Sequence, residues 1–557
     1  MTNQTPRAAT PIDQIAETWV DTLVELDPTV GTYIGRTAGD GRFGDLSPVG
    51  HDRYVQEARR VLAALHAAPV GDAVDEVTRT DLSASLTLDL ASAEAGLQLR
   101  DLNVIASPAQ GVREVFDLMP TRTVADWSTI SERLLAVSPA IDGYIETLRL
   151  GISRGITPAR RQVREVLAQT RRHAAHDGFF AAFAAAASPA TGALPASLAA
   201  DLAFGARRAA AAYDTLSSFL RDDLEPVATL PDAVGRDHYT LVSQQFLGAD
   251  IDLDETYDWG VAELARMTAE QQSAAREVLP GATIAEAIAF LDTDPRRKLH
   301  GTDALQAWMQ QTSDQAVAAL AGTQFDIPDE IKTIECMIAP TQEGGIYYTG
   351  PTDDFSRPGR MWWSVPVGVT DFDTWRELTT VYHEGVPGHH LQIGQAVYNR
   401  ASLNTWRRQL AGTSGHAEGW ALYAERLMEQ LGYLDDPADR LGMLDGQRMR
   451  AARVVLDIGV HLGKPRPDGG GIWNAEHAFD FLSENVNMNA GFVRFEVNRY
   501  LGWPGQAPSY KVGQRLWERL RDECQNREGA AFSVKDFHRR ALALGGVRLD
   551  TLQTALR

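Results

Sequence analysis

The sequence predicts a mostly α-helical protein with one small β-sheet. Apolar residues recur at helical spacing through most of the first 330 residues, beginning at Ile12. Alanine-rich stretches separated by prolines favour closely packed helices joined by short connectors. Runs of β-prone residues follow only after about residue 331. We therefore divide the chain into an N-terminal helical half, residues 1–330, and a C-terminal half with a small β-ribbon, residues 331–557.

The individual elements follow from local patterns. The first amphipathic segment ends at Asp27-Pro28, because the residue before a proline disfavours helical geometry. Ile346–Tyr348 and Met361–Val365 are short β-prone runs bounded by Gly, Pro and Asp, and they predict strands. Helical spacing resumes near Trp375. Further helices are predicted over 415–431, 441–462, 473–487 and 510–525, with a loop over 463–471.

Composition excludes several functional classes. The chain has 557 residues, 44% hydrophobic and 23% charged, which is typical of a soluble globular protein. It carries 53 basic and 74 acidic residues, a net charge of −21, so we expect no nucleic-acid partner. Cys336 and Cys524 are too few for a disulfide framework or a thiolate zinc site. Any transition metal must therefore be held by histidines and carboxylates.

The N-terminal stretch MTNQTPRAATPIDQ lacks the apolar core that a secretory signal requires. The longest apolar run, Phe179–Ala187, is about half the length of a membrane span. These two observations predict a cytoplasmic location and no membrane partner. They leave the oligomeric state open.

The most informative stretch is 379–392, which reads TTVYHEGVPGHHLQ. In the zinc motif HExxH, histidines at i and i+4 share one helical face and bind one ion, while the glutamate polarises the bound water. Here Pro387 stands at i+4 from His383, so the strict motif is broken. The histidines that remain downstream are His389 and His390.

A distorted helix would restore the metal geometry. In an ideal helix, His389 would point about 120° away from His383 and lie roughly 9 Å further along the axis. Pro387 removes a backbone hydrogen bond, and glycines 385 and 388 permit unusual dihedrals around it. A bulge that absorbs two residues would return His389 to the face of His383. We therefore expect these two histidines to be ligands, with His390 in reserve.

A catalytic zinc ion usually takes three protein ligands and a water molecule. The segment 415–425, GHAEGWALYAE, places Glu418 and Glu425 on one helical face. Glu418 is the expected third ligand, since the intervening chain is long enough to bring a second helix against the ion. Glu425 is expected to orient a ligating imidazole from behind. His416 would leave this helix about 160° away from Glu418.

The two segments HEGVPGHHLQ and EGWALYAE resemble the signature of the bacterial family called domain of unknown function 885 (DUF885), which is grouped with zinc metallopeptidases of the gluzincin type. A wider likeness is to carboxypeptidase Taq, thimet oligopeptidase and angiotensin-converting enzyme. The resemblance implies a deep channel between two helical halves, with a small sheet near the active site, and one zinc ion in the C-terminal half. It maps onto His383, Glu384, His389, Gln392 and Glu418.

Two further segments resemble the family. The stretch 503–513, WPGQAPSYKVG, is similar to its Pro-Gly-Gln-x-x-Ser-Tyr pattern. By analogy with related peptidases, Tyr510 would stabilise the oxyanion of the reaction. In RAARVVLDIGVH, either Arg453 or His461 would contact substrate or tie helices together.

The residues before the zinc motif suggest two substrate contacts of their own. Arg360 would hold a substrate carboxylate, or else offset the charge of nearby aspartates. The run Met361–Val365 would form an edge strand that pairs with an extended peptide.

The expected function is a zinc-dependent hydrolase that cleaves amide bonds in short peptides or peptide-like substrates, with Glu384 as general base. Two alternatives stay open. One is a zinc-dependent amidase or related enzyme acting on a specialised metabolite. The other is a helical binding scaffold whose metal site has degenerated.

Overall fold

The computed structural model describes residues 6–339 and 345–557 and confirms the mostly helical class. Local sequence explains the helix ends. Thr10 caps the first helix, α1 (Pro11–Leu26), through a reciprocal pair of hydrogen bonds with Asp13. Asp27 ends α1 and caps α2 (Pro28–Tyr33) at the predicted boundary.

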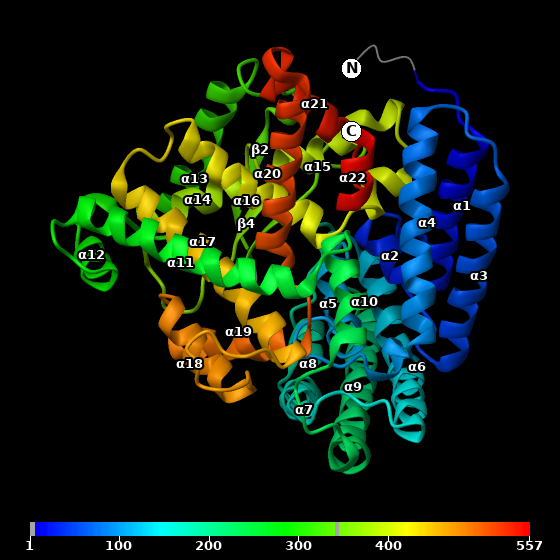
Figure 1. The fold of residues 1–557 in the computed structure, drawn as a ribbon. Coiled ribbons are helices and arrows are strands. Elements are labelled where there is room, and N and C mark those ends of the chain that lie inside the picture. The colour runs from blue at the N-terminus through cyan, green and yellow to red at the C-terminus, as the bar shows by residue number, and fades with distance from the viewer. Residues whose placement is uncertain (1–5, 340–344) are drawn as a thin grey trace.

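The first half of the chain folds as a succession of helices joined by short connectors. Their bounds are α1 Pro11–Leu26, α2 Pro28–Tyr33, α3 Pro48–Ala67, α4 Ala73–Glu94, α5 Pro108–Leu118, α6 Val124–Arg154, α7 Arg160–Ala174, α8 Phe179–Ala185, α9 Ala196–Phe219, α10 Arg236–Leu247, α11 Leu253–Val278, α12 Ile284–Leu291 and α13 Thr302–Leu320. In Figure 1, α1, α3 and α4 stand side by side, and α9 lies below them with α7 and α8.

A three-stranded sheet forms where the β-prone runs predicted strands. It has the order β2-β4-β3, with β2 (Ile334–Ile338) parallel and β3 (Ile346–Thr349) antiparallel to β4 (Gly359–Trp363). A separate two-stranded ladder pairs β1 (Lys298–His300) with β5 (Asp371–Asp373). The expectation of an edge strand at Met361–Val365 is wrong, because β4 is bonded on both sides and has no free backbone edge for a peptide.

The remaining helices carry the candidate site. Their bounds are α14 Thr374–Glu384, α15 His389–Tyr398, α16 Ser414–Gln430, α17 Pro437–Leu462, α18 Ala475–Asn485, α19 Ala490–Gly502, α20 Ser509–Glu528, α21 Val534–Ala543 and α22 Leu549–Leu556. The loop predicted over 463–471 follows the end of α17. The largest apolar core joins these helices to α10–α13, and α11 runs along α17 (Figure 1).

Helices α16 and α20 cross at two glycines. A Cβ atom on Gly419 would lie 2.5 Å from the carbonyl carbon of Gly513, so no larger residue fits at this contact. The close approach matters for the site, because Glu418 and Tyr510 lie beside this crossing on opposite helices. The boundary at residues 330 and 331 stays a prediction, since the largest core contains residues from both sides of it.

Candidate metal centre

The predicted helix distortion is a complete break. Helix α14 ends at Glu384, and a new helix, α15, begins at His389. The four residues between them include a cis Val386-Pro387 peptide bond. The expected two-residue bulge within one helix is therefore wrong in form. Two separate helices have replaced it, and they achieve the same convergence of histidines.

The break depends on a glycine at position 388. A Cβ atom there would lie 1.8 Å from the carbonyl oxygen of His383 and 2.5 Å from that of Tyr382. The Gly388 amide instead donates a hydrogen bond of 3.0 Å to the Tyr382 carbonyl. From α16, the indole of Trp420 donates to the Pro387 carbonyl at 2.9 Å. The linker between the two helices is thus hydrogen-bonded both to α14 and to α16, and these contacts orient the start of α15.

Three predicted ligands converge at this break. Atom Nε2 of His383 lies 3.2 Å from Oε2 of Glu418, and Nε2 of His389 lies 3.6 Å from the same oxygen. The rings of His383 and His389 are perpendicular, with centroids 4.9 Å apart. Ligand atoms of His383, Glu384 and His389 also lie within 4.8 Å of one another. Two imidazoles and two carboxylates therefore surround one small volume.

This donor set fits a zinc ion. Tetrahedral bonds of 2.0–2.1 Å place neighbouring ligand atoms about 3.4 Å apart, close to the two distances at Glu418. Borderline-soft imidazoles with one carboxylate are a common set for catalytic zinc. Atoms Nδ1 of His389 and Oε2 of Glu384 are buried without a partner in the described part of the chain. Glu384 is free for proton transfer if Glu418 is the ligand.

His383 is held from behind by a buried polar chain. Its Nδ1 donates to Oε1 of Glu425 at 2.8 Å, and Gln447 donates to the other oxygen of Glu425 at 3.1 Å. Lys511 then donates to Oε1 of Gln447 at 2.6 Å and pairs with Glu263 at 3.1 Å. Each member satisfies the next, so the chain fixes the orientation of the imidazole.

Electrostatics at the site reflect this enclosure. Burial opposes a charge on His383, but hydrogen bonds with Glu418 and Glu425 raise its pKa to about 10. Burial also opposes a charge on Glu418, yet its two imidazole partners hold its pKa well below the usual value. Burial raises the pKa of Glu384, which has no such hydrogen bond. The two carboxylates therefore occupy different electrostatic environments.

Tyr510 lies near the site with an arginine against its ring. The guanidinium of Arg453 stands 5.2 Å from the centroid of the Tyr510 ring. Arg453 is fixed by hydrogen bonds to the Tyr500 hydroxyl at 2.6 Å and to Glu496 at 3.0 Å. Burial raises the pKa of Tyr510, and the charge of Glu418 adds to this rise. Tyr510 is therefore protonated at neutral pH and can donate a hydrogen bond.

Four other predicted residues are engaged elsewhere. His390 donates from Nε2 to the Ile331 carbonyl at 2.7 Å and accepts from the Tyr348 hydroxyl at 2.8 Å, so neither nitrogen is free for a metal. Gln392 donates to the His416 carbonyl at 3.2 Å and ties α15 to α16. His461 bonds to the Tyr500 carbonyl at 3.0 Å, and Arg360 pairs with Glu335 at 2.6 Å. The roles predicted for these residues at the site stay predictions.

Arg450 was missed by sequence reasoning. It lies on α17 one turn from Gln447 and one turn from Arg453, which contact Glu425 and Tyr510 respectively. Its Nε is buried without a partner, and it makes no ion pair with any residue that the structure describes. Its charge acts to lower the pKa of Glu384 and of Glu425, so the guanidinium interacts with the carboxylates of the site without a direct ion pair. In the sequence, only the three-residue spacing from Arg453 could have indicated that Arg450 lies near the site.

Comparison with known protein families identifies the family of this chain. A family model described as "Bacterial protein of unknown function (DUF885)" matches residues 28–556. The chain belongs to the DUF885 family. No curated protein matches its sequence.

Among the solved structures that match this chain are two that share its fold, with TM-scores of 0.85 and 0.74. One is described as "the putative lipoprotein from Colwellia psychrerythraea", with 21% identity over 98% of each chain and a TM-score of 0.85. A second is "a putative lipoprotein of unknown function from Shewanella oneidensis", with 16% identity over 98% of this chain and 99% of that one and a TM-score of 0.74. A Pyrococcus furiosus carboxypeptidase matches with 10% identity over 98% of this chain and 94% of that one, and a TM-score of 0.44.

These neighbours contradict the cytoplasmic location expected from the sequence. Two proteins that share this fold over nearly their full lengths are each described as a "putative lipoprotein", which points to a location outside the cytoplasm. The cytoplasmic prediction rested on the lack of an apolar core in the first residues and on the short length of the longest apolar run. Within 6–339 and 345–557, no helix has both the length and the apolar character needed to cross a membrane.

Proposed function

We propose that this DUF885 protein is a zinc-dependent hydrolase of the gluzincin type that cleaves amide bonds in short peptides or peptide-like substrates. One observation carries the proposal. The Nε2 atoms of His383 and His389 lie 3.2 and 3.6 Å from one carboxylate oxygen of Glu418, beside the buried carboxylate of Glu384, which has an unpartnered oxygen. A purely structural cluster would be expected to pair each of its buried polar atoms.

Each residue then has a distinct role. His383, His389 and Glu418 would hold the ion, with Glu425 fixing the proton on Nδ1 of His383. When bound, zinc lowers the pKa of a coordinated water and polarises the substrate carbonyl. Glu384 accepts a proton from the attacking water and passes it to the leaving nitrogen. Its buried position supports this role, because a raised carboxyl pKa makes the group a better proton acceptor.

Tyr510 would donate its hydroxyl proton as a hydrogen bond to the oxygen that becomes negative during attack. Arg453 supports this role by packing against the tyrosine ring, where it restricts the orientation of the side chain. Arg450 supplies a positive charge that interacts with the carboxylates of the site without a direct ion pair. A screen of short peptides against N-acyl amino acids would separate a peptidase from an amidase acting on a specialised metabolite.

The decisive experiment changes Glu384 to Gln and measures zinc content and turnover of a peptide library. We expect one equivalent of zinc to be retained and turnover to fall by roughly 10²–10⁴-fold, the usual contribution of a general base. Glu429→Gln, on the partly exposed side of α16, is the matched control and should change neither quantity. Unchanged turnover in the Glu384 variant, or wild-type protein that cannot be loaded with zinc, would favour the non-catalytic scaffold.

A further inference from the structure

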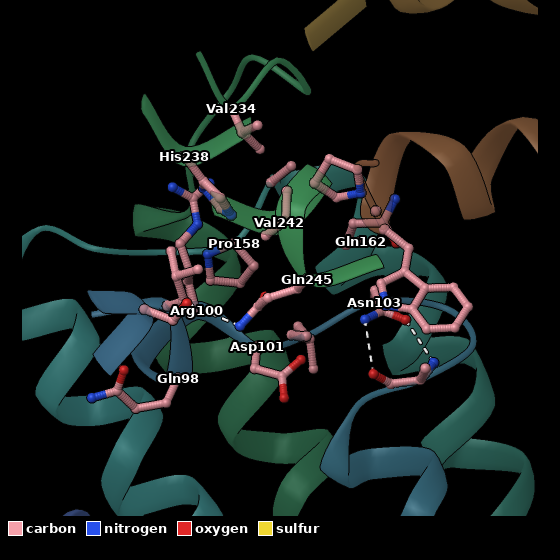
Figure 2. Close-up of a pocket in the computed structure, with 18 of the residues that line it drawn as sticks. Gln98, Arg100, Asp101, Asn103, Pro158, Gln162, Val234, His238, Val242 and Gln245 are labelled. Atoms are coloured by element: carbon pink, nitrogen blue, oxygen red, sulfur yellow. Dashed lines mark hydrogen bonds between the residues drawn. The ribbon is translucent and has the colours of Figure 1, made fainter. Parts of the chain in front are cut away.

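A cavity of about 440 Å³ lies away from the metal centre, between α3, α4, α7, α10 and the segment that follows α19 (Figure 2). None of the residues assigned to the metal centre lines it. Its volume falls in the range of sites for small molecules, roughly 300–1,000 Å³. The chemistry of its wall can therefore be read separately from the proposed hydrolase site.

The first notable group is Arg100, the last residue of the short 3-10 helix Leu97–Arg100. It lines the cavity and has no ion pair or side-chain hydrogen bond with any residue that the structure describes. Burial lowers its pKa, and no nearby carboxylate opposes this effect. Because an arginine stays protonated in proteins, its charge must be met by water or by a ligand.

The second group is Asp101, the adjacent residue on the cavity wall. Its carboxylate also has no ion pair or hydrogen bond within the described residues. The side chain is accessible to solvent, yet the enclosing protein raises its pKa to about 7. Arg100 does not contribute to this shift, so the two opposite charges do not offset one another. The cavity thus presents one guanidinium and one carboxylate with no partner, beside Asp89, whose carboxylate accepts a hydrogen bond from the Tyr54 hydroxyl.

The rest of the wall combines apolar side chains with polar atoms that have no hydrogen-bond partner. Nδ1 of His238 and Oε1 of Gln98 and Gln162 are buried without a partner in the described parts of the chain. Phe246 and Trp503 meet edge to face, with ring centroids 5.1 Å apart, and offer an aromatic surface. Figure 2 shows Arg100 and His238 close together on one side of this cavity. Unpaired polar atoms beside an apolar surface are the usual composition of a ligand site.

We propose that this cavity binds a small zwitterion, a free amino acid or a short peptide, whose carboxylate pairs with Arg100 and whose ammonium group pairs with Asp101. Both groups lack a protein partner, and one zwitterion satisfies both. An anion alone would leave Asp101 without a partner, and a cation alone would leave Arg100 without one. The aromatic and aliphatic wall favours a ligand with an apolar body. This inference does not depend on the proposed hydrolase activity.

Calorimetric titration of the full chain tests the proposal, with a chelator present so that the metal centre takes no part. Leucine and glycyl-leucine distinguish an amino-acid ligand from a peptide ligand. N-acetylleucine lacks the ammonium group, and leucinamide lacks the carboxylate. We expect leucine or glycyl-leucine to bind, and each analogue to bind at least about tenfold more weakly.

Two variants of the cavity residues provide a second test of the proposal. Arg100→Gln and Asp101→Asn should each weaken binding at least about tenfold, whereas Arg208→Gln and Asp201→Asn, at exposed positions of α9, should not. Circular dichroism checks that each variant is folded, and if one is not, the analogue series on wild-type protein decides alone. The proposal is overturned if neither ligand binds, if N-acetylleucine or leucinamide binds as tightly as leucine, or if folded Arg100 and Asp101 variants bind normally.

Discussion

His383 and Glu425 form a buried hydrogen bond of 2.8 Å between Nδ1 and Oε1. A carboxylate can only accept, so this contact places a proton on Nδ1 and directs Nε2 toward Glu418 and His389. The pair joins α14 to α16 across 42 residues of sequence. It therefore sets the tautomer that a metal-ligating histidine needs.

Replacing Glu425 with Gln should weaken zinc binding roughly 10–100-fold, the usual effect of losing a residue that orients a ligand. The neutral amide holds the imidazole less strongly and no longer increases its basicity. Competition with a chromogenic chelator measures the affinity. Glu429→Gln is the control on the same helix. An unchanged zinc affinity in the Glu425 variant would show that this contact is structural only.

The two adjacent histidines should behave differently. His389→Ala is expected to abolish stoichiometric zinc binding, because it removes one of the two converging imidazoles. His390→Ala should retain the metal, since both nitrogens of His390 already bond to Ile331 and Tyr348. Elemental analysis of protein reconstituted with zinc measures the outcome. The reverse result would make His390 the ligand and would require α15 to rotate.

Gly388→Ala should destabilise the protein by more than about 2 kcal/mol. Its new methyl group would lie 1.8 Å from the carbonyl oxygen of His383, a backbone atom that cannot move aside alone. Gly111→Ala is the matched control, because its Cβ meets nothing within 4 Å in the exposed part of α5, and it should stabilise by roughly 0.5–1 kcal/mol. Denaturant unfolding in the presence of a chelator compares them. Equal stabilities would mean that the linker adjusts freely.

Asp457 provides a test of pH dependence away from the metal centre. Burial raises its pKa to about 7, although Tyr239 and the Gly505 amide donate to one of its oxygens at 2.6 and 2.9 Å. Because the folded-state pKa exceeds the unfolded value, the folded protein holds this proton more tightly. The protonated carboxyl group therefore contributes to the free energy of unfolding at low pH, and this contribution is lost as pH rises toward and through 7.

Asp457→Asn should remove this dependence while keeping the two hydrogen bonds to its carbonyl oxygen. The free energy of unfolding of the variant minus that of wild type should rise by up to about 1.4 kcal/mol per pH unit between about pH 4.5 and 6.5. Denaturant unfolding of both proteins at matched pH values measures this difference. A difference that stays flat across that range would show that the carboxyl group ionises normally inside the protein.

Much of the site could be predicted because its residues lie in two short segments. The HEGVPGHH and EGWALYAE stretches placed His383, His389, Glu418 and Glu425 on helices, and the structure brings these side chains together. The form of the distortion could not be predicted, since a bulge and a complete break satisfy the same local pattern. The strand predicted over Met361–Val365 forms two residues earlier, at Gly359–Trp363, and its central position depends on β2 and β3, which pair with it across the sheet.

Local sequence accounts for the helical class, for the helix ends at capping residues and prolines, and for the chemical identity of the candidate metal donors. These properties depend on side chains within a few residues of one another. Long-range packing was needed to show that both nitrogens of His390 are hydrogen-bonded and that Lys511 and Gln447 support Glu425. It was also needed to show that Arg100 and Asp101 line one cavity without pairing. Those relationships depend on which distant helices pack together and on how much water their contacts exclude.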